Sequence, residues 1–186
     1  MKQIGGDSIR VVHPLFQEDD DGSTPISPLQ FEVSEVSVTI AMILNSEWHS
    51  RLPKTQKGNL QRNKKYVFYA AFYKNMFYAT AIWTSPIARS MDDKTILELR
   101  RFAISEDAPK NTASRMLAVM RRMIKIKYPD VCKLISYQDT EVHKGTIYAA
   151  SGWKIANRST GSNWKVGRKR NDYQASGEKI RWEYDL

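Results

Sequence analysis

The chain has 186 residues, 41% of them hydrophobic, which is the size of one domain with additional arms and enough for a real core. Its formal net charge of +9 favours polyanionic partners such as nucleic acid, an acidic membrane or a phosphate-bearing cofactor, with a merely solvated basic surface as the alternative. No apolar run approaches the roughly 20 residues of a membrane span, and the N-terminus lacks an apolar signal-peptide core, so we expect a cytoplasmic protein without a membrane partner.

The N-terminal segment is acidic and poor in regular patterns. Residues 1–29 contain a Gly-Gly pair, the acidic run 18–21 and two prolines in STPISP, which predicts a loosely ordered arm. The charge is unevenly distributed, because residues 1–47 hold 2 Lys/Arg against 8 Asp/Glu, whereas residues 48–150 hold 19 against 8. The positive charge therefore belongs to the middle of the chain.

The first half of the predicted domain alternates strands with one helix. The alternating LQFEVSEVSV predicts a strand, and Ser37 is suited to cap a helix over 38–48. A polar loop, HSRLPKTQKGN, follows. YVFYAAFY and MFYATAIW then predict two strands joined by Lys74-Asn75, where Asn tolerates the left-handed backbone of a tight hairpin.

The second half continues with strands and helices in alternation. TILELRRFAIS predicts a strand, and after the turn SEDAPKN a helix begins with Asn111 or Thr112 as its cap. Pro129 stops this helix. Its apolar face consists of Met116, Leu117, Met120, Met123 and Ile124.

The last predicted elements are two strands around a short helix. VCKLISY predicts a strand in which the single cysteine, Cys132, is expected to be a buried, inert thiol. One cysteine excludes an internal disulfide and a Cys-based zinc cluster. VHKGTIYAAS predicts a helix that ends at Gly152, and WKIANRS a further strand. The tail 157–186 is basic and aromatic, and is expected to be an extension that contacts nucleic acid, with a C-terminal strand and a disordered end as the alternative.

This element order predicts an α/β (α+β) fold with a mixed sheet. A strand–helix–strand unit favours a parallel pair, while the hairpin is antiparallel. The order β-α-β-β-β-α-β-α-β resembles that of GNAT acyltransferases, whose mostly antiparallel central sheet is flanked by helices. We therefore expect an acidic arm over 1–29, a GNAT-like catalytic domain over 30–156 and an extension over 157–186.

Two motifs carry the resemblance to GNAT enzymes. RRFAISEDAPKNTASRML resembles the element whose helix N-terminus holds the pyrophosphate of acetyl-CoA, since free N–H groups and the helix dipole bind anions. Ala113 fits the family loop, while Asn111 stands where glycine is usual and Ala108 where Gln or Arg is usual. GTIYAASGW resembles the end of the last helix, where a tyrosine protonates the leaving thiolate, and Tyr148 takes that position.

Three segments are similar to one narrower group, the phage Mom-type DNA modification proteins. These segments are EWHSRLPKTQKG, LELRRFAISEDAPKNTASRML and LISYQDTEVHKGTIYAASGW, within about residues 30–155. The resemblance implies conversion of adenine in DNA to N6-(methylcarbamoyl)adenine, which protects phage DNA from host restriction nucleases in the host cytoplasm. The alternatives are a GNAT N-acetyltransferase acting on a protein or small amine, and a non-enzymatic DNA-binding protein on a GNAT scaffold.

The resemblance also implies site residues and partners. The catalytic residues implied are His49, Arg101, Ser114, Asp139 and Tyr148. The donor implied is acetyl-CoA or a related acyl donor, held by Phe102, Ala103, Ile104, Lys110, Asn111, Thr112, Ala113 and Ser114. Contacts to double-stranded DNA are expected from Arg51, Lys54, Lys57, Lys165, Arg168, Lys169 and Arg170.

Each implied residue also has a plain structural reading. His49 is otherwise a surface loop histidine, Tyr148 a packing tyrosine, and Asp139 a helix cap, for which Thr140 is equally suited. Arg100 and Arg101 face opposite sides of a strand, and parity alone does not choose between them. Two histidines and an aspartate suffice to hold iron or zinc, but their spacing matches no metal motif, so no metal ligand is assigned. The oligomeric state is left open, with a dimer as one alternative.

Overall fold

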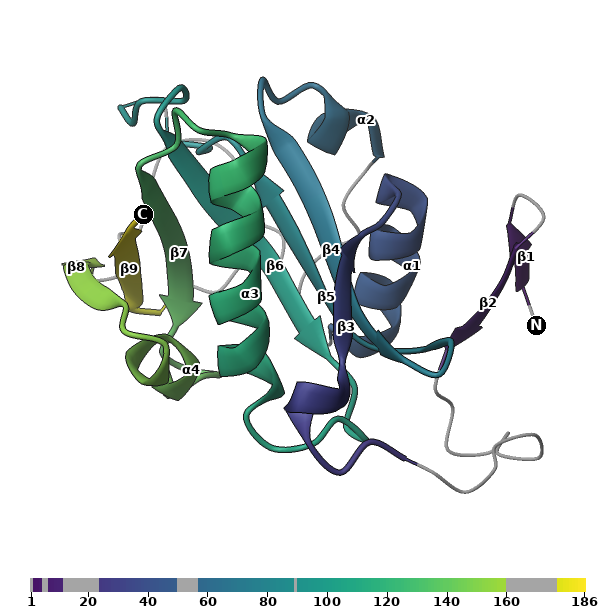
Figure 1. Cartoon of the computed structure of the whole chain (residues 1–186). Coiled ribbons are helices and arrows are strands. Elements are labelled where there is room, and N and C mark those ends of the chain that lie inside the picture. Colours follow the sequence, from purple (N-terminus) through teal and green to yellow (C-terminus); the bar gives the residue numbers. More distant parts are fainter. Residues whose placement is uncertain (1, 5–6, 12–23, 50–56, 89, 160–176) are drawn as a thin grey trace.

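The computed structural model describes residues 2–4, 7–11, 24–49, 57–88, 90–159 and 177–186. Figure 1 shows the helices and strands with their labels. In chain order they are β1 (Lys2–Ile4), β2 (Asp7–Val11), the 3-10 helix η1 (Pro28–Gln30), β3 (Glu32–Glu35), α1 (Val38–Trp48), α2 (Lys57–Gln61), β4 (Tyr66–Tyr73), β5 (Met76–Thr84), β6 (Ile96–Ile104), α3 (Thr112–Lys127), β7 (Lys133–Asp139), α4 (Thr146–Ala150), β8 (Lys154–Ser159) and β9 (Lys179–Asp185).

The described strands join into one sheet. Its order is β1-β2-β5-β6-β7-β9-β8, and β4 pairs with β5 on one side and β3 on the other. All neighbouring strands are antiparallel except β2–β5 and β6–β7. The parallel β6–β7 pair follows from the helix α3 between them, because a parallel neighbour can be reached only by a crossover. The predicted mixed, mostly antiparallel sheet is confirmed.

Two separate apolar clusters cover the two faces of this sheet. Alternation along β4 sends Val67 and Tyr69 into the larger cluster and Phe68 into the smaller one. Helix α3 packs on the larger cluster and crosses the front of the sheet in Figure 1, whereas α1 and α2 form the smaller cluster on the opposite face. The buried residues of α3 include Met116, Leu117, Met120 and Ile124, as its apolar spacing predicted.

The hairpin between β4 and β5 turns as its sequence indicates. Lys74 and Asn75 have φ values of 46° and 65°, and these positive angles give the turn the twist that two antiparallel strands need. Asn111 has the third positive φ among described non-glycine residues, 69°, at the start of α3.

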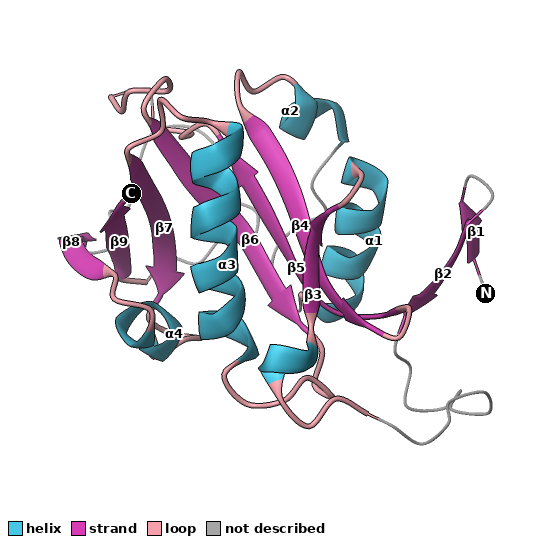
Figure 2. Ribbon diagram, viewed as in Figure 1, coloured by secondary structure: helices cyan, strands magenta, loops and turns pink. Residues whose placement is uncertain are grey.

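The C-terminal residues 177–186 are part of the sheet and not an extension from it. Strand β9 lies between β7 and β8 and pairs antiparallel with both, as Figure 2 shows. Its alternating side chains Ile180 and Trp182 are buried in the larger cluster. The strand β9 agrees with the alternative of a C-terminal strand in this tail, because it supplies core side chains and the ladder partner of β7. Residues 160–176, the rest of that tail, lie outside the described residues.

Three further expectations need correction. The N-terminal arm contains the hairpin β1–β2, and β2 pairs with β5 at its Met76 end, so part of this arm has regular structure. Helix α4 begins at Thr146 and not at Val142, because residues 139–142 form a turn. Cys132 is exposed, since Val131 takes the buried position before β7 and the next side chain points outward.

Candidate active site

The sheet opens between β6 and β7. These parallel strands pair from Ile96–Lys133 to Leu99–Ser136, and no later pair joins them. From Arg101 onward β6 pairs only with β5, and β7 continues alone with β9, so the two strands diverge toward their C-terminal ends (Figure 1). The β7-facing edge of β6 over 100–104 is thus without a strand partner among the described residues. Ligands in open α/β sheets bind at such carboxyl ends.

A β-bulge decides which arginine enters the site. Trp83 pairs with Leu99 and Ile82 pairs with Arg101, so Arg100 is an extra residue in β6. Without the bulge, Leu99 and Arg101 would share a face. With it, Leu99 faces α3, while Arg101 lies beside Ile82 on the face that α1 covers. The residue that the family resemblance implied therefore lies on the α1 side.

Burial changes the properties of Arg101 without changing its charge. Burial chiefly, together with the neighbouring Arg100, lowers the pKa of the Arg101 guanidinium, and the nearby Glu98 carboxylate acts against this. An arginine nevertheless stays charged at physiological pH. Burial also raises the pKa of Glu98, which accepts a hydrogen bond of 3.0 Å from the Ile87 backbone N–H. Glu98 thus fixes the loop after β5 and contributes negative charge beside Arg101.

His49 ends helix α1 and faces the same region. It is the C-cap residue, and its backbone N–H donates to the Asn45 carbonyl at 2.9 Å. Burial, followed by the positive charges of Arg101 and His143, lowers the pKa of His49 below the ordinary histidine value of 6.5. This shift favours the neutral imidazole at pH 7, and His49 lies partly buried at the end of α1.

Three polar atoms of this region are buried and lack hydrogen-bond partners among the described residues. They are Asn45 Oδ1, His49 Nδ1 and Arg101 Nε. An unsatisfied buried polar atom typically destabilises a fold by about 1–3 kcal/mol. Native structures keep few of them, and each one needs a physical explanation.

Tyr148 reaches the opening from the other face of the sheet. Its ring is buried in the larger cluster, stacks on Trp182 and lies edge-on to Trp153. Its hydroxyl is 2.8 Å from the Ser136 hydroxyl, which in turn donates to the Leu99 carbonyl at 3.3 Å. Since Leu99–Ser136 is the last pair that joins β6 to β7, the phenol lies where the strands separate.

The surroundings of Tyr148 keep its phenol protonated. Burial raises the pKa of this group above its usual value of 10, and the hydrogen bond with Ser136 opposes that shift. A protonated phenol is a proton donor and not a base at neutral pH. The packing role that the sequence left as an alternative is real as well, since the ring belongs to the core.

Asp139 ends β7 and organises the turn that follows. Its Oδ1 accepts from the Glu141 N–H at 3.1 Å, and its carbonyl accepts from the His143 N–H at 3.0 Å. It does not cap α4, whose N-cap is Gly145, and Thr140 binds the Glu178 carbonyl instead. Because Ser136 and Gln138 contact the α4 side, alternation turns Asp139 to the face that carries Arg101.

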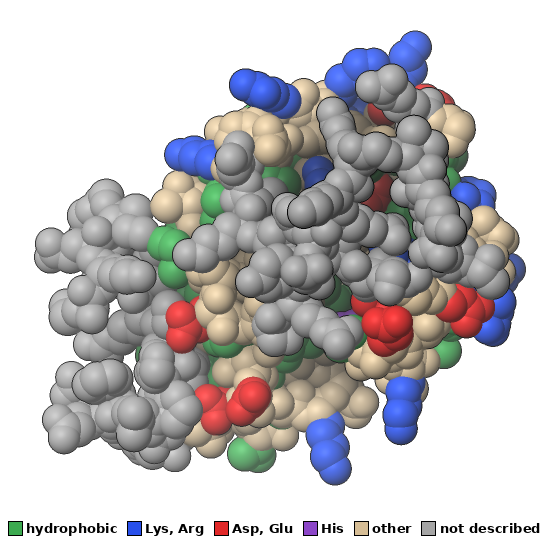
Figure 3. Space-filling model, turned by 180° about the vertical axis from the view of Figure 1, so that it is seen from behind, with side chains coloured by type: hydrophobic (Ala, Val, Ile, Leu, Met, Phe, Trp, Pro, Cys, Tyr) green, Lys and Arg blue, Asp and Glu red, His purple; other side chains and the backbone are tan. Residues whose placement is uncertain are grey.

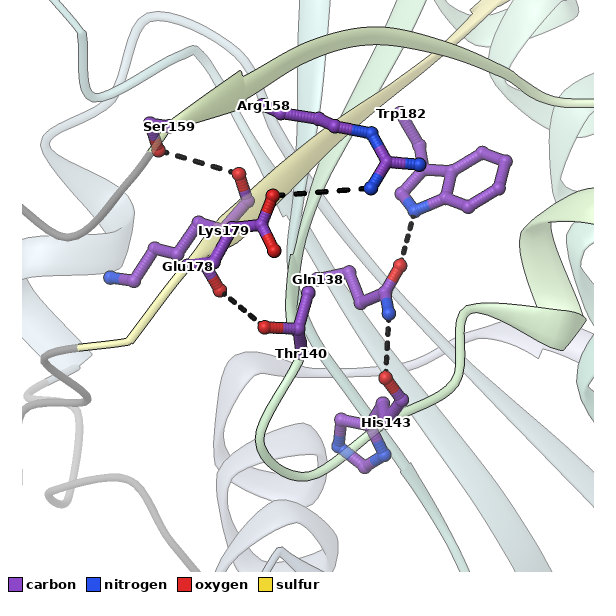
Figure 4. A network of polar contacts seen from close by, with 8 residues as sticks. All are labelled: Gln138, Thr140, His143, Arg158, Ser159, Glu178, Lys179 and Trp182. Carbon is purple, nitrogen blue, oxygen red and sulfur yellow. Dashed lines mark hydrogen bonds and ion pairs between the residues drawn. The ribbon is translucent and has the colours of Figure 1, made fainter.

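Gln138 fixes the loop that carries His143. Its Nε2 donates to the His143 carbonyl at 2.6 Å, and its Oε1 accepts from the Trp182 indole at 2.7 Å (Figure 4). A Cβ on Gly145 would lie 2.3 Å from Gln138 Oε1, and Gly145 has a φ of 72°, so a glycine is needed here. Sequence analysis did not single out Gln138, because its partner Trp182 is 44 residues away along the chain.

The start of α3 has the form of an anion site. Asn111 takes the left-handed conformation in place of glycine, and its side chain makes no capping hydrogen bond. The Ser114 hydroxyl donates to the Asn111 carbonyl at 3.0 Å, and the Thr112 hydroxyl donates to the Pro109 carbonyl. Of the other residues predicted to hold the donor, Lys110 is exposed, Ala103 and Ala113 are buried, and Phe102 and Ile104 are partly buried on the α3 side.

The structure therefore groups the predicted catalytic residues by face. His49, Arg101 and Asp139 lie on the α1 side, Tyr148 meets the opening from the α4 side, and Ser114 is engaged at the start of α3. Figure 3 shows the molecule from behind, opposite α3, with Lys and Arg side chains around the margin of this face. Asp and Glu side chains also lie on this face, so it carries both signs of charge.

Most of the predicted DNA contacts fall outside the part of the chain that the structure describes. Lys57 is exposed at the start of α2, and its ammonium group donates to the Thr39 hydroxyl at 3.4 Å. Arg51, Lys54, Lys165, Arg168, Lys169 and Arg170 lie in the ranges 50–56 and 160–176, which are not described.

Two kinds of feature are absent from the described residues. No group of three or more His, Cys, Asp or Glu side chains comes together there to hold a metal ion, so His49, Asp139 and His143 do not form such a set. No helix within the described ranges has the length and apolar character needed to cross a membrane.

The sequence of this chain matches one protein family over most of its length. A family model described as the Mom protein family matches residues 30–183, which run from η1 into β9. The chain belongs to the Mom protein family. The match extends beyond the limit near residue 155 that the motifs suggested, in agreement with the place of β9 in the sheet. No curated protein matches this Mom-family chain in sequence.

Solved structures place this Mom-family chain in the GNAT fold. A GNAT family acetyltransferase from Elizabethkingia anophelis with acetyl-CoA bound is 14% identical, with a TM-score of 0.54 over 84% of this chain and 99% of that one. The Bacillus subtilis acetyltransferase in complex with CoA is 11% identical, with a TM-score of 0.55 over 84% and 98%. The Escherichia coli ribosomal-protein-S18-alanine N-acetyltransferase is 13% identical, with a TM-score of 0.57 over 83% and 93%. At these identities the likeness concerns the fold alone.

Proposed function

We propose that this Mom-family chain is a transferase that modifies the exocyclic amine of adenine in DNA, giving N6-(methylcarbamoyl)adenine. The observation that carries the proposal is the placement of His49, whose pKa burial lowers, and of the Tyr148 phenol, whose pKa burial raises, on opposite faces of the sheet where β6 and β7 separate. A base and an acid on the two sides of one opening are what transfer to a weak amine requires. The family membership and the net charge of +9 support DNA as the substrate.

The chain's own residues fit an acyl-CoA donor. Two of the solved GNAT structures carry acetyl-CoA or CoA. Acetyl-CoA itself would give N6-acetyladenine, so the proposed product requires a carrier-bound donor whose transferred group already contains the amide nitrogen, with the carrier as the leaving group. The unpaired edge of β6 over 100–104 offers backbone groups to an extended, amide-containing arm. The uncapped start of α3, with Lys110 beside it, suits a pyrophosphate.

The roles of the residues follow from their protonation states. The adenine N6 is a poor nucleophile because its lone pair is drawn into the ring, so its proton must leave as the new carbon–nitrogen bond forms. His49 takes this proton, since it is neutral, whereas the Asp139 carboxylate is bound to the turn after β7. Tyr148 donates its proton to the departing group as the bond to the carrier breaks, and the Ser136 hydroxyl orients the phenol. Arg101 provides fixed positive charge for a developing oxyanion.

DNA must approach the face that carries His49. Adenine N6 within a duplex is reached by extruding the base, which binding to the phosphate backbone helps to stabilise. Lys57 and the basic residues of 50–56 and 160–176 are proposed to hold that backbone.

The test is the chemistry of the DNA itself. The protein is produced in a bacterial host, plasmid DNA is digested to nucleosides, and deoxyadenosine is analysed by mass spectrometry beside Tyr148→Phe and Asp139→Ala variants. Tyr66→Phe, which alters a tyrosine at the other end of the sheet, is the matched control. We expect a heavier deoxyadenosine that disappears in Tyr148→Phe and persists in Tyr66→Phe.

The mass of the product separates the alternatives. An acetyl adduct is lighter than a methylcarbamoyl adduct by one NH group, so its appearance would establish the transferase and overturn the proposed product. Unmodified adenine in every sample, with folded protein present, would overturn the proposal and favour acetyl transfer to another amine.

A further inference from the structure

The three unpartnered atoms of Asn45, His49 and Arg101 belong to one small region. Asn45 precedes His49 by one turn of α1, so both side chains lie along the same side of the helix, which continues the buried positions Val38 and Ala41. Helix α1 contacts β5 and β6, and Arg101 lies beside Ile82 beneath it. Arg101 is also close enough to His49 to lower the pKa of that histidine. The unmet hydrogen bonds therefore belong to side chains of α1 and β6, two elements that contact each other.

The hydrogen-bonding capacity of these three atoms specifies which groups a ligand must present to them. A carboxamide oxygen only accepts hydrogen bonds, and a guanidinium nitrogen only donates them. The missing ligand must therefore present a donor and an acceptor side by side. A neutral imidazole with its hydrogen on Nε2 has a lone pair on Nδ1, so the ligand must also offer a second donor. An aromatic ring nitrogen next to an exocyclic amine has all three features.

Among the nucleobases this requirement excludes thymine, which has a carbonyl instead of an amine. Adenine presents its N6 amine beside a ring nitrogen acceptor, whereas guanine presents two acceptors, O6 and N7, on its major-groove edge and an amine beside a ring nitrogen only on its minor-groove edge. Cytosine has an amine beside a ring nitrogen, but its single ring is smaller. Asparagine is the usual partner of the adenine N6–N7 edge.

We propose that Asn45 and Arg101 read the amine edge of the target adenine and orient its N6 toward His49. Asn45 Oδ1 accepts one N6 hydrogen, Arg101 Nε donates to the neighbouring ring nitrogen, and the second N6 hydrogen points to His49 Nδ1. Asn45 is thus a specificity-determining residue, which none of the sequence motifs marked. This inference rests on the proposed DNA adenine substrate and names the groups that select it.

The first experiment replaces Asn45 by leucine, which has a similar size and no acceptor. If Asn45 Oδ1 is kept unpaired for a ligand, Asn45→Leu raises the urea midpoint of the protein while it lowers adenine modification at least about tenfold, as the loss of one hydrogen bond in a built polar site does. If Asn45 instead has a structural role, Asn45→Leu would lower the urea midpoint. Asn63→Leu, which removes an amide that donates to the Asn59 and Leu60 carbonyls, is the control and lowers stability instead.

The second experiment measures binding without catalysis. Single-stranded oligothymidylates carry one central adenine, one purine without the amine, or one cytosine, and fluorescence anisotropy gives the affinity of each. The wild type is expected to bind the adenine probe at least about fivefold more tightly than the other two, and Asn45→Leu to bind all three alike. Equal binding by the wild type, or a preference that survives in Asn45→Leu, would overturn the inference.

The modification experiment and the binding experiment together distinguish a failure of this inference from a failure of the proposed function. If the wild type and the Asn45→Leu variant modify adenine equally well, the proposed role of Asn45 is wrong and the proposed function is retained. A wild type that never modifies DNA but prefers the adenine probe through Asn45 supports the reading site and overturns the transferase. An Asn45→Leu variant that is less stable than the wild type makes Asn45 a structural residue and contradicts the proposal.

Discussion

The protonation of His49 is the residue-scale property on which the chemistry depends. Its pKa is lowered by burial first, then by Arg101 and His143. Removing the charge of Arg101 should therefore move the pKa of His49 back toward 6.5. An NMR titration of the His49 ring protons in the wild type, in Arg101→Gln and in Arg115→Gln measures this, since Arg115 is an exposed residue of α3 and its change should leave His49 unaffected. A His49 that titrates at or above 6.5 in the wild type would contradict the neutral base.

The same shift makes folding pH-dependent. A histidine with a lowered pKa takes up a proton more readily in the unfolded chain, so the free energy of unfolding falls as the pH drops below about 6.5 and levels off below the folded-state pKa. We expect urea unfolding at pH 7.5 and pH 5.5 to differ less in His49→Gln than in the wild type. An equal pH dependence in both proteins would assign the effect to other groups.

The catalytic role of the Tyr148 phenol can be separated from the stability that its hydrogen bond with Ser136 provides. Tyr148→Phe removes the acid and is expected to reduce modification by about 10²-fold or more, while unfolding becomes easier by only about 1 kcal/mol. Ser136→Ala removes the same hydrogen bond and keeps the acid, so it should destabilise the protein similarly and retain most activity. If Ser136→Ala is as inactive as Tyr148→Phe, orientation of the phenol matters more than its proton.

At the scale of single elements, the start of α3 depends on one left-handed residue. Asn111 has a φ of 69°, in the left-handed region that glycine adopts most readily. Asn111→Gly should be neutral or slightly stabilising, whereas Asn111→Ala should lower the free energy of unfolding by about 1 kcal/mol, because an alanine pays more steric strain in this conformation. Urea unfolding monitored by circular dichroism measures both. An alanine variant as stable as the glycine variant would show that the turn relaxes.

The loop between β7 and α4 depends on Gly145, a second residue with a left-handed backbone. Gly145→Ala places a Cβ 2.3 Å from Gln138 Oε1 at a φ of 72°, so we expect a loss of about 2 kcal/mol or more. Gly58→Ala is the matched control, since a Cβ there meets nothing within 4 Å. Thermal unfolding of the two variants decides the comparison. A Gly145→Ala variant as stable as Gly58→Ala would show that Gln138 moves aside freely.

Sequence patterns predicted those features of the fold that are local. The period of α3 and the Lys74-Asn75 hairpin depend on neighbouring residues, and both are found in the structure. The face of Arg101 was not predictable, because a bulge at Arg100 breaks the alternation and depends on pairing with β5. Asn45 and Gln138 were missed for a related reason, since their importance comes from partners, or missing partners, on other elements.

At the scale of the whole molecule, the C-terminal strand completes the sheet. The segment KIRWEYD alternates as a strand, yet its place between β7 and β8 could not be predicted from local pattern, since β7 lies some 40 residues earlier in the chain. This strand also joins the core to the site, because Trp182 stacks on Tyr148 and holds Gln138. The last residues of the chain therefore support both the fold and the loop that carries His143.

This arrangement leads to a prediction about Trp182. Trp182→Ala removes a buried ring and the partner of Gln138, so it should lower the free energy of unfolding by about 3–5 kcal/mol. Trp182→Phe keeps the ring stack and loses only the indole N–H, so its stability loss should be much smaller while the His143 loop loosens. Lys179→Ala, an exposed change in the same strand, should stay within about 0.5 kcal/mol of the wild type. Urea unfolding gives the stabilities, and hydrogen exchange of the His143 amide reports the loop, because this N–H is bonded to the Asp139 carbonyl. A Trp182→Ala variant that unfolds like the wild type would show that β9 contributes little to the stability of the core.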